Sequence, residues 1–250
     1  MADPAYLETP KHRRIAYHLT PGEGPTVVFC GGFMSDMEGT KALFLESWAA
    51  AAGRAFLRFD YSGHGQSSGA FTDGSIGDWA DDAYRTITSV VEGPVLLVGS
   101  SMGGWISLIL ARKMPEKVAG LVGIAAAPDF TEDSMWAGFT DAEKAELAQN
   151  GHIALPSDYS DEPYIITETL IEDGRRNLVL RAPLELSFPA RFLQGTADED
   201  VPVAVAMRLL DHAAGDDIRL TLVKDADHRF STPECLALIA ESIDEVLAAL

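Results

Sequence analysis

Short apolar runs alternate with longer segments of helical periodicity along most of the chain. The central runs are almost continuously apolar, as parallel strands covered on both faces must be. The predicted strands lie at residues 26–30, 55–59, 95–99, 121–125, 190–195 and 218–223. The helical patterns between them lie at residues 40–53, 75–91, 102–113, 201–215 and 232–250. This alternation predicts an α/β fold with a doubly wound, mostly parallel sheet and right-handed crossovers.

An antiparallel edge strand and a long insertion complete the predicted fold. Residues 15–19 are predicted to form the edge strand. The alternation stops between residues 128 and 188, where we predict a lid insertion after the sixth strand. We expect it to cover the carboxyl edge of the sheet, where open α/β folds bind ligands; the alternative is a decorated crossover that does not move. Residues 1–250 as a whole are predicted to form a single domain.

The insertion carries its own local signals. Thr140 and Glu143 have capping-box spacing at the start of a predicted helix at residues 140–151. Residues 152–167 are predicted to form a hairpin, and residues 168–176 a short helix. Its large apolar side chains are Phe130, Met135, Trp136, Phe139, Tyr159 and Tyr164. We expect Trp136 and Phe139 to line a substrate pocket, because residues three apart share one face of a helix.

The overall charge of the chain indicates which classes of binding partner are unfavourable. The chain has 250 residues with a formal net charge of −19, 47% hydrophobic and 23% charged residues. Such an acidic surface argues against nucleic acid as a partner, because phosphates are bound by Lys and Arg. It also weakens the case for highly anionic substrates, unless a local basic patch attracts them. A small-molecule substrate is therefore the expected partner, and the oligomeric state stays open.

Cysteine usage and hydropathy give an expected location. Cys30 and Cys235 lie in apolar segments and are predicted to be buried thiols, since two cysteines make no disulfide framework. No apolar run approaches the roughly 18 residues that a membrane helix needs. The first residues contain acids and no apolar signal region. We therefore expect a cytoplasmic protein with no membrane span.

A glycine-flanked serine pair follows the strand at residues 95–99. Ser101 has Gly99 and Gly103 two residues away on either side, whereas Ser100 has the larger Val98 and Met102. A nucleophile at a sharp strand-to-helix turn needs small residues at both of these positions, which gives the pattern G-x-S-x-G. The helix predicted at 102–113 supplies the context that this motif requires. Ser101 is therefore the candidate nucleophile.

A serine hydroxyl needs a general base near neutral pH. Among six histidines, His228 follows the last strand and precedes the last helix, in a loop that can reach over the nucleophile. His64 lies in a glycine-rich loop that we expect to pack beneath the site. His228 is therefore the predicted base, and a structural role is predicted for His64.

The base needs a carboxylate on its other ring nitrogen. Three acids follow the strand at residues 190–195. Asp198 is the predicted acid, while Asp200 is better placed as the N-cap of the next helix and Glu199 is expected to be solvated. Asp129, which follows an earlier strand, is the rival position. The resulting chain order of nucleophile, acid and base is that of α/β-hydrolases.

The developing oxyanion needs hydrogen-bond donors. The residue after the nucleophile, Met102, offers one backbone N–H. The loop after the first parallel strand contains Gly31 and Gly32, which allow close approach and leave the Phe33 N–H facing the pocket. Phe33 and Met102 are therefore the predicted oxyanion hole.

Several stretches together resemble a known family. They are FCGGFMSDMEGTKA, RFDYSGHGQSSG, VGSSMGGW, FLQGTADEDVP and DADHRFS. They look like α/β-hydrolases, most closely the branch of palmitoyl-protein thioesterase and mycophenolic acid acyl-glucuronide esterase with its bacterial carboxylesterase relatives. The resemblance implies the triad Ser101, Asp198 and His228 with Phe33 and Met102 as oxyanion hole. The Cys-Gly-Gly sequence of the oxyanion loop departs from the His-Gly or Pro-Gly of many hydrolases, without changing the backbone donors.

These features predict a serine hydrolase without metal or cofactor that cleaves carboxylic esters of short to medium acyl chains. Met34, Trp105, Trp136 and Phe139 are its expected pocket residues. The histidines lack the close spacing of a zinc helix motif, and no cysteine pair offers thiolates. One alternative is an S-acyl (palmitoyl-type) thioesterase or acyl-glucuronide esterase with the same triad. A catalytically idle binding protein of the same fold is the other alternative.

Overall fold

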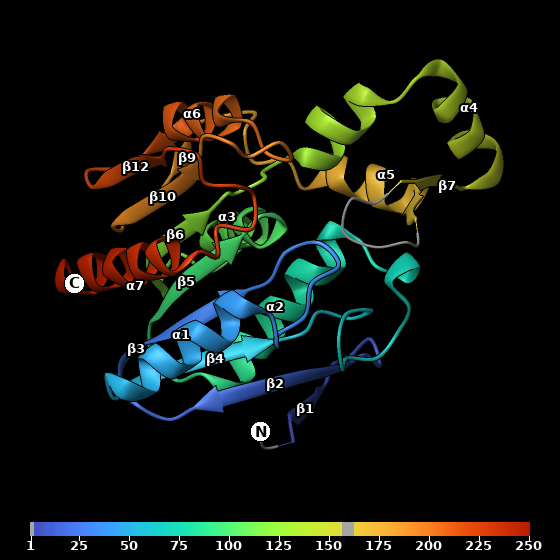
Figure 1. The fold of residues 1–250 in the computed structure, drawn as a ribbon. Helices are drawn as coiled ribbons and strands as arrows, with labels where there is room; N and C mark the ends of the chain where they lie inside the picture. Colours follow the sequence, from blue (N-terminus) through green and yellow to red (C-terminus); the bar gives the residue numbers. More distant parts are fainter. Residues whose placement is uncertain (1–2, 157–162) are drawn as a thin grey trace.

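The structure is a computed structural model that describes residues 3–156 and 163–250. One eight-stranded sheet forms its centre. Its strands are β1 (Ala5–Glu8), β2 (Arg14–Thr20), β3 (Glu23–Cys30), β4 (Arg54–Phe59), β5 (Val95–Ser100), β6 (Val118–Ile124), β10 (Ala190–Gly195) and β12 (Ile218–Val223). Their order is β1-β2-β4-β3-β5-β6-β10-β12, and all pairs from β4 to β12 are parallel (Figure 1). This confirms the predicted doubly wound, mostly parallel sheet.

The first edge of the sheet differs from the prediction. Residues 15–19 do form an antiparallel strand within β2, which pairs with β4. They are not at the edge, however, because β1 adds a further antiparallel strand outside them. The residues of β1 are mostly exposed, so this strand lacks the apolar run by which the other strands were predicted.

Helices cover both faces of the sheet. They are α1 (Thr40–Ala51), α2 (Ile76–Val90), α3 (Met102–Lys113), α6 (Val203–His212) and α7 (Pro233–Ala248), with a short 3₁₀ turn η1 (Phe71–Asp73). Val27 and Phe29 of β3 pack with α1 and α7 in one buried cluster, whereas Val28 and Cys30 pack with α2 and α3 in the other. Successive strand residues point to opposite faces. This alternation explains why the central strands are apolar at every position.

The segment between β6 and β10 forms small elements of its own. They are a π-helical turn η2 (Thr131–Trp136), α4 (Asp141–Asn150), β7 (His152–Leu155), β8 (Tyr164–Thr167) and α5 (Glu168–Arg176). β7 and β8 pair as the predicted hairpin. In Figure 1, α4, α5 and β7 gather in one lobe beside the sheet. Tyr159, one of the aromatic residues noted in this segment, lies outside the described residues.

Local sequence signals account for the start and end of α4. The Thr140 hydroxyl accepts a hydrogen bond from the Glu143 amide at 3.2 Å, and the Glu143 carboxylate accepts one from the Thr140 amide at 2.7 Å. This is the predicted capping box, which satisfies two backbone donors at the helix end. Gly151 ends α4 with a positive φ of 76°, a conformation that glycine adopts without a Cβ clash.

A single carboxylate joins the two ends of the insertion. Asp129 is fully buried, and its oxygens accept hydrogen bonds from the amides of Val179 and Leu180 at 2.8 and 3.0 Å. Arg181 donates a further hydrogen bond to it at 2.9 Å. Burial raises the pKa of Asp129, and these hydrogen bonds only partly offset that rise. The base of the insertion is therefore fixed to the point where the chain leaves β6.

The helix after the acidic loop begins later than predicted. α6 starts at Val203 with Pro202 as its N-cap residue, so Asp200 is not the N-cap. The Asp200 amide instead donates to Asp198 at 3.0 Å. Two very short strands, β9 (Leu184–Glu185) and β11 (Ala213–Ala214), pair with each other near the end of α6. Within residues 3–156 and 163–250, no helix combines the length and apolar character needed to cross a membrane.

Candidate active site

Ser101 occupies the sharp turn between β5 and α3. Its backbone has φ 54° and ψ −117°, a strained conformation for a residue with a side chain. A Cβ on Gly99 would lie 2.4 Å from the Gly103 carbonyl oxygen, and a Cβ on Gly103 would lie 2.0 Å from the Cys30 carbonyl oxygen. Both distances are far below a normal contact. The two glycines are therefore required by backbone crowding, and the turn presents Ser101 at its tip.

A hydrogen-bonded relay connects Ser101, His228 and Asp198. The Nε2 atom of His228 lies 3.1 Å from the Ser101 Oγ. The Nδ1 atom lies 2.9 and 3.1 Å from the two carboxylate oxygens of Asp198. A carboxylate accepts, so Nδ1 carries the proton and Nε2 is left to accept the Ser101 hydroxyl. This is the arrangement that a base needs to remove a proton from a serine.

The environment of Asp198 keeps it ionised. Burial by itself raises the pKa of this carboxyl group. Hydrogen bonds from His228, the Val201 amide and the Gln194 side chain outweigh burial and hold the pKa below its ordinary value. At neutral pH the carboxylate is therefore charged, and it can stabilise the imidazolium that forms when His228 takes a proton.

The structure shows which of the two serines and which of the two candidate acids contact His228. Ser100 is the last residue of β5 and is buried, and it does not take part in the described relay. Asp129, the rival acid, is engaged by Val179, Leu180 and Arg181 at the base of the insertion. The structure therefore brings Ser101 and Asp198 to His228.

The loop after β3 passes directly over the nucleophile. A Cβ on Gly32 would lie 3.6 Å from the Ser101 Cβ, so this backbone is in close contact with the turn. The Ser35 amide and hydroxyl both donate to the Gly32 carbonyl, at 3.3 and 2.9 Å, which closes the loop into a tight turn around Phe33. Met102 is the first residue of α3, where an amide has no intrahelical acceptor. Phe33 and Met102 are thus well placed as candidate oxyanion donors.

A cavity of about 670 Å³ opens onto Ser101 and His228. Part of its lining is apolar, namely Phe33, Met34, Ala127, Phe130, Met135, Tyr164 and Val201. Another part is polar or charged and contains Ser35, Asp36, Thr40, Lys41, Ser134, Asp200, Arg229 and Ser231. The Phe33 ring lies 5.6 Å from Phe130 and 5.9 Å from Tyr164, centroid to centroid. Residues of the insertion therefore form part of the cavity wall.

Comparison with known proteins agrees with this geometry. Residues 24–167 match the model of the family described as "Serine aminopeptidase, S33". The chain is also 34% identical over 244 residues to a rat protein, "Palmitoyl-protein thioesterase ABHD10, mitochondrial", covering 97% of this chain and 82% of that one. This chain belongs to the α/β-hydrolases.

Two solved structures show how far the likeness to this hydrolase extends. One from Agrobacterium vitis superposes with a TM-score of 0.94 at 41% identity, covering 98% of both chains. Mouse α/β hydrolase domain-containing protein 10 superposes with a TM-score of 0.91 at 33% identity, covering 99% of both chains. The family identifies the chain as an enzyme of the serine hydrolase type. That disfavours the idle binding protein considered from sequence.

The expected cytoplasmic location is contradicted by these relatives. The matching rat and bovine proteins are both named as mitochondrial. The expectation depended on Cys30 and Cys235, which are indeed buried and free. Buried thiols show only that the fold does not require a disulfide, so they do not identify the compartment of this hydrolase.

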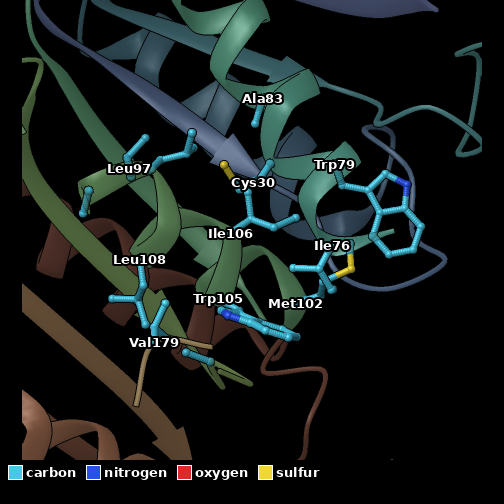
Figure 2. Packing of buried hydrophobic residues seen from close by; sticks show 14 of the residues in the cluster. Cys30, Ile76, Trp79, Ala83, Leu97, Met102, Trp105, Ile106, Leu108 and Val179 are labelled. Atoms are coloured by element: carbon cyan, nitrogen blue, oxygen red, sulfur yellow. The ribbon is translucent and has the colours of Figure 1, made fainter. Parts of the chain in front are cut away.

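The predicted pocket residues are only partly brought to the cavity. Met34 lines it, with 48% of its surface exposed. Trp105 is fully buried, and its ring nitrogen donates to the Asn177 carbonyl at 3.0 Å. Figure 2 shows Trp105 among the side chains of the buried cluster on the α2 and α3 side of the sheet. Trp105 is therefore a core residue, because it lies on the face of α3 that packs inward.

Trp136 and Phe139 are also absent from the described lining of the cavity. Their rings lie 6.2 Å apart, and the Arg175 guanidinium lies 4.4 Å from the centroid of the Trp136 ring. Met135, the neighbour of Trp136, faces the cavity instead. The π-helical turn η2 explains the error, since the i, i+3 spacing of an α-helix does not define a face there.

Trp136→Ala is expected to lower stability and to leave acyl-chain preference unchanged. The half-buried ring packs on Phe139 and beneath Arg175, so its loss is expected to cost about 1–3 kcal/mol. In a chain of this size, each kcal/mol lowers Tm by roughly 2–4 °C. Differential scanning fluorimetry and kcat/KM for short and long acyl substrates measure the two effects. Met135→Ala is the matched control, and a changed preference only in the Trp136 variant would contradict the assignment.

Two buried polar residues that the sequence did not single out hold the oxyanion loop and the acid. Asp60 accepts hydrogen bonds from the amides of Met37 and Gln66 at 2.7 and 2.8 Å, and burial raises its pKa to about 6. Gln194, on β10, donates to Asp198 at 2.9 Å and to the Val201 carbonyl at 2.8 Å. The contact of Asp60 with Met37 joins two separate loops, and those of Gln194 depend on the path of the loop after β10, so no sequence motif reveals them.

His64 has the structural position predicted for it. It is buried, and its Nδ1 atom lies 3.1 Å from the Ser62 carbonyl. Its Nε2 atom accepts the Met34 amide at 3.3 Å. Burial lowers the pKa of His64, so the neutral imidazole needed for this acceptor role is favoured. His64 therefore supports the loop that carries Phe33.

The one described group of side chains close enough to hold a metal ion overlaps the relay. Ligand atoms of Asp198, Asp200 and His228 lie within 4.8 Å of one another. Asp198 and His228 already bond to each other, so an ion bound there would compete with the relay for the same atoms. The geometry supports proton transfer through these residues.

Proposed function

We propose that this hydrolase cleaves S-acyl thioesters through an acyl-enzyme on Ser101. The observation that carries the proposal is the relay from Ser101 through His228 to Asp198, which opens onto a cavity with an apolar wall. The name palmitoyl-protein thioesterase, given to relatives that match 97% of this chain, supports a thioester as substrate. The apolar residues at the cavity provide the surface that an acyl chain would contact.

The first half of the reaction forms the acyl-enzyme. The Ser101 oxygen attacks the thioester carbonyl carbon while its proton passes to Nε2 of His228. The oxygen of the tetrahedral intermediate gains a negative charge, which the amides of Phe33 and Met102 stabilise. The carbon–sulfur bond then breaks, and His228 gives its proton to the leaving sulfur. The products of this half are an ester on Ser101 and a free thiol.

Water completes the cycle. His228 removes a proton from a water molecule, whose oxygen attacks the ester carbonyl carbon. The bond to Ser101 breaks, and the serine oxygen regains a proton from His228. The net reaction converts one thioester and one water into a carboxylic acid and a thiol. Asp198 stays ionised throughout and holds the imidazole in the required tautomer.

Carboxylic esters of short to medium acyl chains are the second candidate, with acyl glucuronides as a special case. The observation that favours them is the relay itself, because a serine, a histidine and two amide donors would contact only the carbonyl group and the leaving atom of a substrate. An oxygen leaving group can take the proton of His228 in the same way as sulfur. Hydrolysis rates of matched thioesters and esters therefore decide whether sulfur or oxygen is the preferred leaving atom.

A matched substrate series tests the proposal. Thioesters of N-acetylcysteamine and p-nitrophenyl esters, each from acetyl to palmitoyl, are compared by kcat/KM. We expect measurable turnover of thioesters and fluorophosphonate labelling at Ser101. Turnover of the esters alone would replace the proposed function by the second candidate. Absence of fluorophosphonate labelling at Ser101 in every preparation would contradict both candidate functions.

A further inference from the structure

The cavity lining contains two cations, Lys41 and Arg229, together with two acids, Asp36 and Asp200. Lys41, the second residue of α1, lines the cavity, and its Nζ donates to the Arg229 carbonyl oxygen. The N-cap residue of α1 is Gly39, which supplies no side-chain cap, and the first turn of α1 has no acidic residue. Gly39 and Thr40 line the same cavity. The positive end of the α1 dipole thus adds to the charge of Lys41.

The charge of Lys41 has no ion-pair partner among the residues that the structure describes. No carboxylate oxygen of these residues lies within 4.0 Å of its Nζ. Burial lowers the pKa of Lys41 to about 8, against the influence of the Asp227 carboxylate. Its one described hydrogen bond, to the Arg229 carbonyl, uses one of the three N–H donors of an ammonium group. An anion in the cavity would supply the missing counter-charge.

The hydrogen bond to the Arg229 carbonyl brings Lys41 to the loop that carries His228. The leaving atom must receive a proton from Nε2 of His228, so the leaving group extends past this histidine. Arg229 follows His228 directly, and its carbonyl is held by Lys41. The apolar residues Phe33, Phe130 and Tyr164 form a separate cluster of rings, suited to the acyl chain. On this arrangement the acyl chain and the leaving group would contact different surfaces of the cavity.

We propose that Lys41 binds a carboxylate on the leaving group of the substrate. The preferred substrates are then acyl compounds whose thiol or alcohol carries an acidic group within a few atoms of the scissile bond. This inference rests on the proposed function and adds a specificity-determining residue to it. A hydrogen bond between charged groups is stronger than a neutral one, so it would select for acidic leaving groups.

The test compares two thioesters that differ only in charge. S-butyryl-N-acetylcysteine carries a carboxylate two carbons from sulfur, and S-butyryl-N-acetylcysteinamide carries a neutral amide there. We expect the full-length enzyme to hydrolyse the acid with a kcat/KM about 10- to 100-fold higher, the range given by a hydrogen bond to a charged group. A ratio near one in the unaltered enzyme would overturn the proposal.

Two variants distinguish the effect of the Lys41 charge from the effect of its hydrogen bond to the loop that carries His228. In Lys41→Gln the amide can still donate to the Arg229 carbonyl, but the charge is gone, so the ratio should fall to within about threefold of one by loss of that charged bond. Lys41→Arg keeps the charge and should keep most of the preference. If Lys41→Gln lowers both rates equally and leaves the ratio intact, Lys41 only positions the loop and the inference is wrong.

Failure of the proposed function can be recognised separately. If neither thioester is hydrolysed, the thioesterase proposal fails, and the same ratio is measured with butyryl esters of 4-hydroxybenzoic acid and 4-hydroxybenzamide. A preference for the acid that depends on Lys41 would still support the anionic leaving group. Equal rates for these two esters would overturn it.

Discussion

Ser101→Ala is expected to lower kcat on an activated acyl substrate by on the order of 10⁵ to 10⁶, because the relay acts as a unit. Its hydroxyl is the group that lies 3.1 Å from His228 Nε2, at a turn held by two crowded glycines. Alanine fits the same backbone, so the fold should persist. Stopped-flow kinetics on a p-nitrophenyl ester, with circular dichroism as a check of folding, measures the effect.

Ser100→Ala is the matched control for this loss. Ser100 adjoins the nucleophile and is buried at the end of β5. Its loss removes one hydroxyl from a packed site, and such changes cost about 0.5–3 kcal/mol in stability. Most activity should remain. An inactive Ser100 variant beside an active Ser101 variant would show that the assignment of the nucleophile is reversed.

Asp198→Asn is expected to lower kcat by roughly 10⁴ while the fold is kept. Asparagine has the shape of the carboxylate, but its NH₂ group cannot accept the Nδ1–H of His228. The imidazole then loses both the required tautomer and the charge that stabilises its protonated form. The measurement is kcat from pH 6 to 9, together with Tm.

Asp129→Asn should behave in the opposite way. Its two carboxylate oxygens accept the Val179 and Leu180 amides and the Arg181 guanidinium, and an asparagine NH₂ would face one of these donors. Leaving buried donors unpaired costs about 1–3 kcal/mol, so Tm should fall while kcat of the remaining folded enzyme stays within tenfold. A larger loss of kcat at Asp129 than at Asp198 would move the catalytic acid to the earlier strand.

The sequence predicts the structure best where a local pattern has only one physical solution. The glycines beside Ser101 are such a case, because any side chain at Gly99 or Gly103 would collide with backbone. The capping box of α4 is another, since Thr140 and Glu143 satisfy each other's amides within one turn. The central strands are a third case, because burial on both faces requires an uninterrupted apolar run.

The cavity walls could not be predicted in the same way. Trp105 follows Ser101 by four residues, yet the face of α3 that carries it packs into the core. Periodicity shows that a helix has an inner face, but it does not show whether that face meets a cavity or the sheet. The contacts of Lys41 with Arg229 and of Asp60 with Met37 depend on how separate strands and their loops meet. They belong to tertiary structure, and spacing along the chain does not encode them.

The closure of the insertion at Asp129 has a consequence for how such enzymes can diverge. Asp129 binds the amides of Val179 and Leu180, so the two ends of the insertion lie next to each other. Segments with adjacent ends can be lengthened, shortened or exchanged without moving the scaffold that carries them. The residues of the relay follow β5 and β10 or lie in the loop before α7, all outside the insertion. Exchange of the insertion can therefore change which substrates are accepted, while the catalytic relay stays the same.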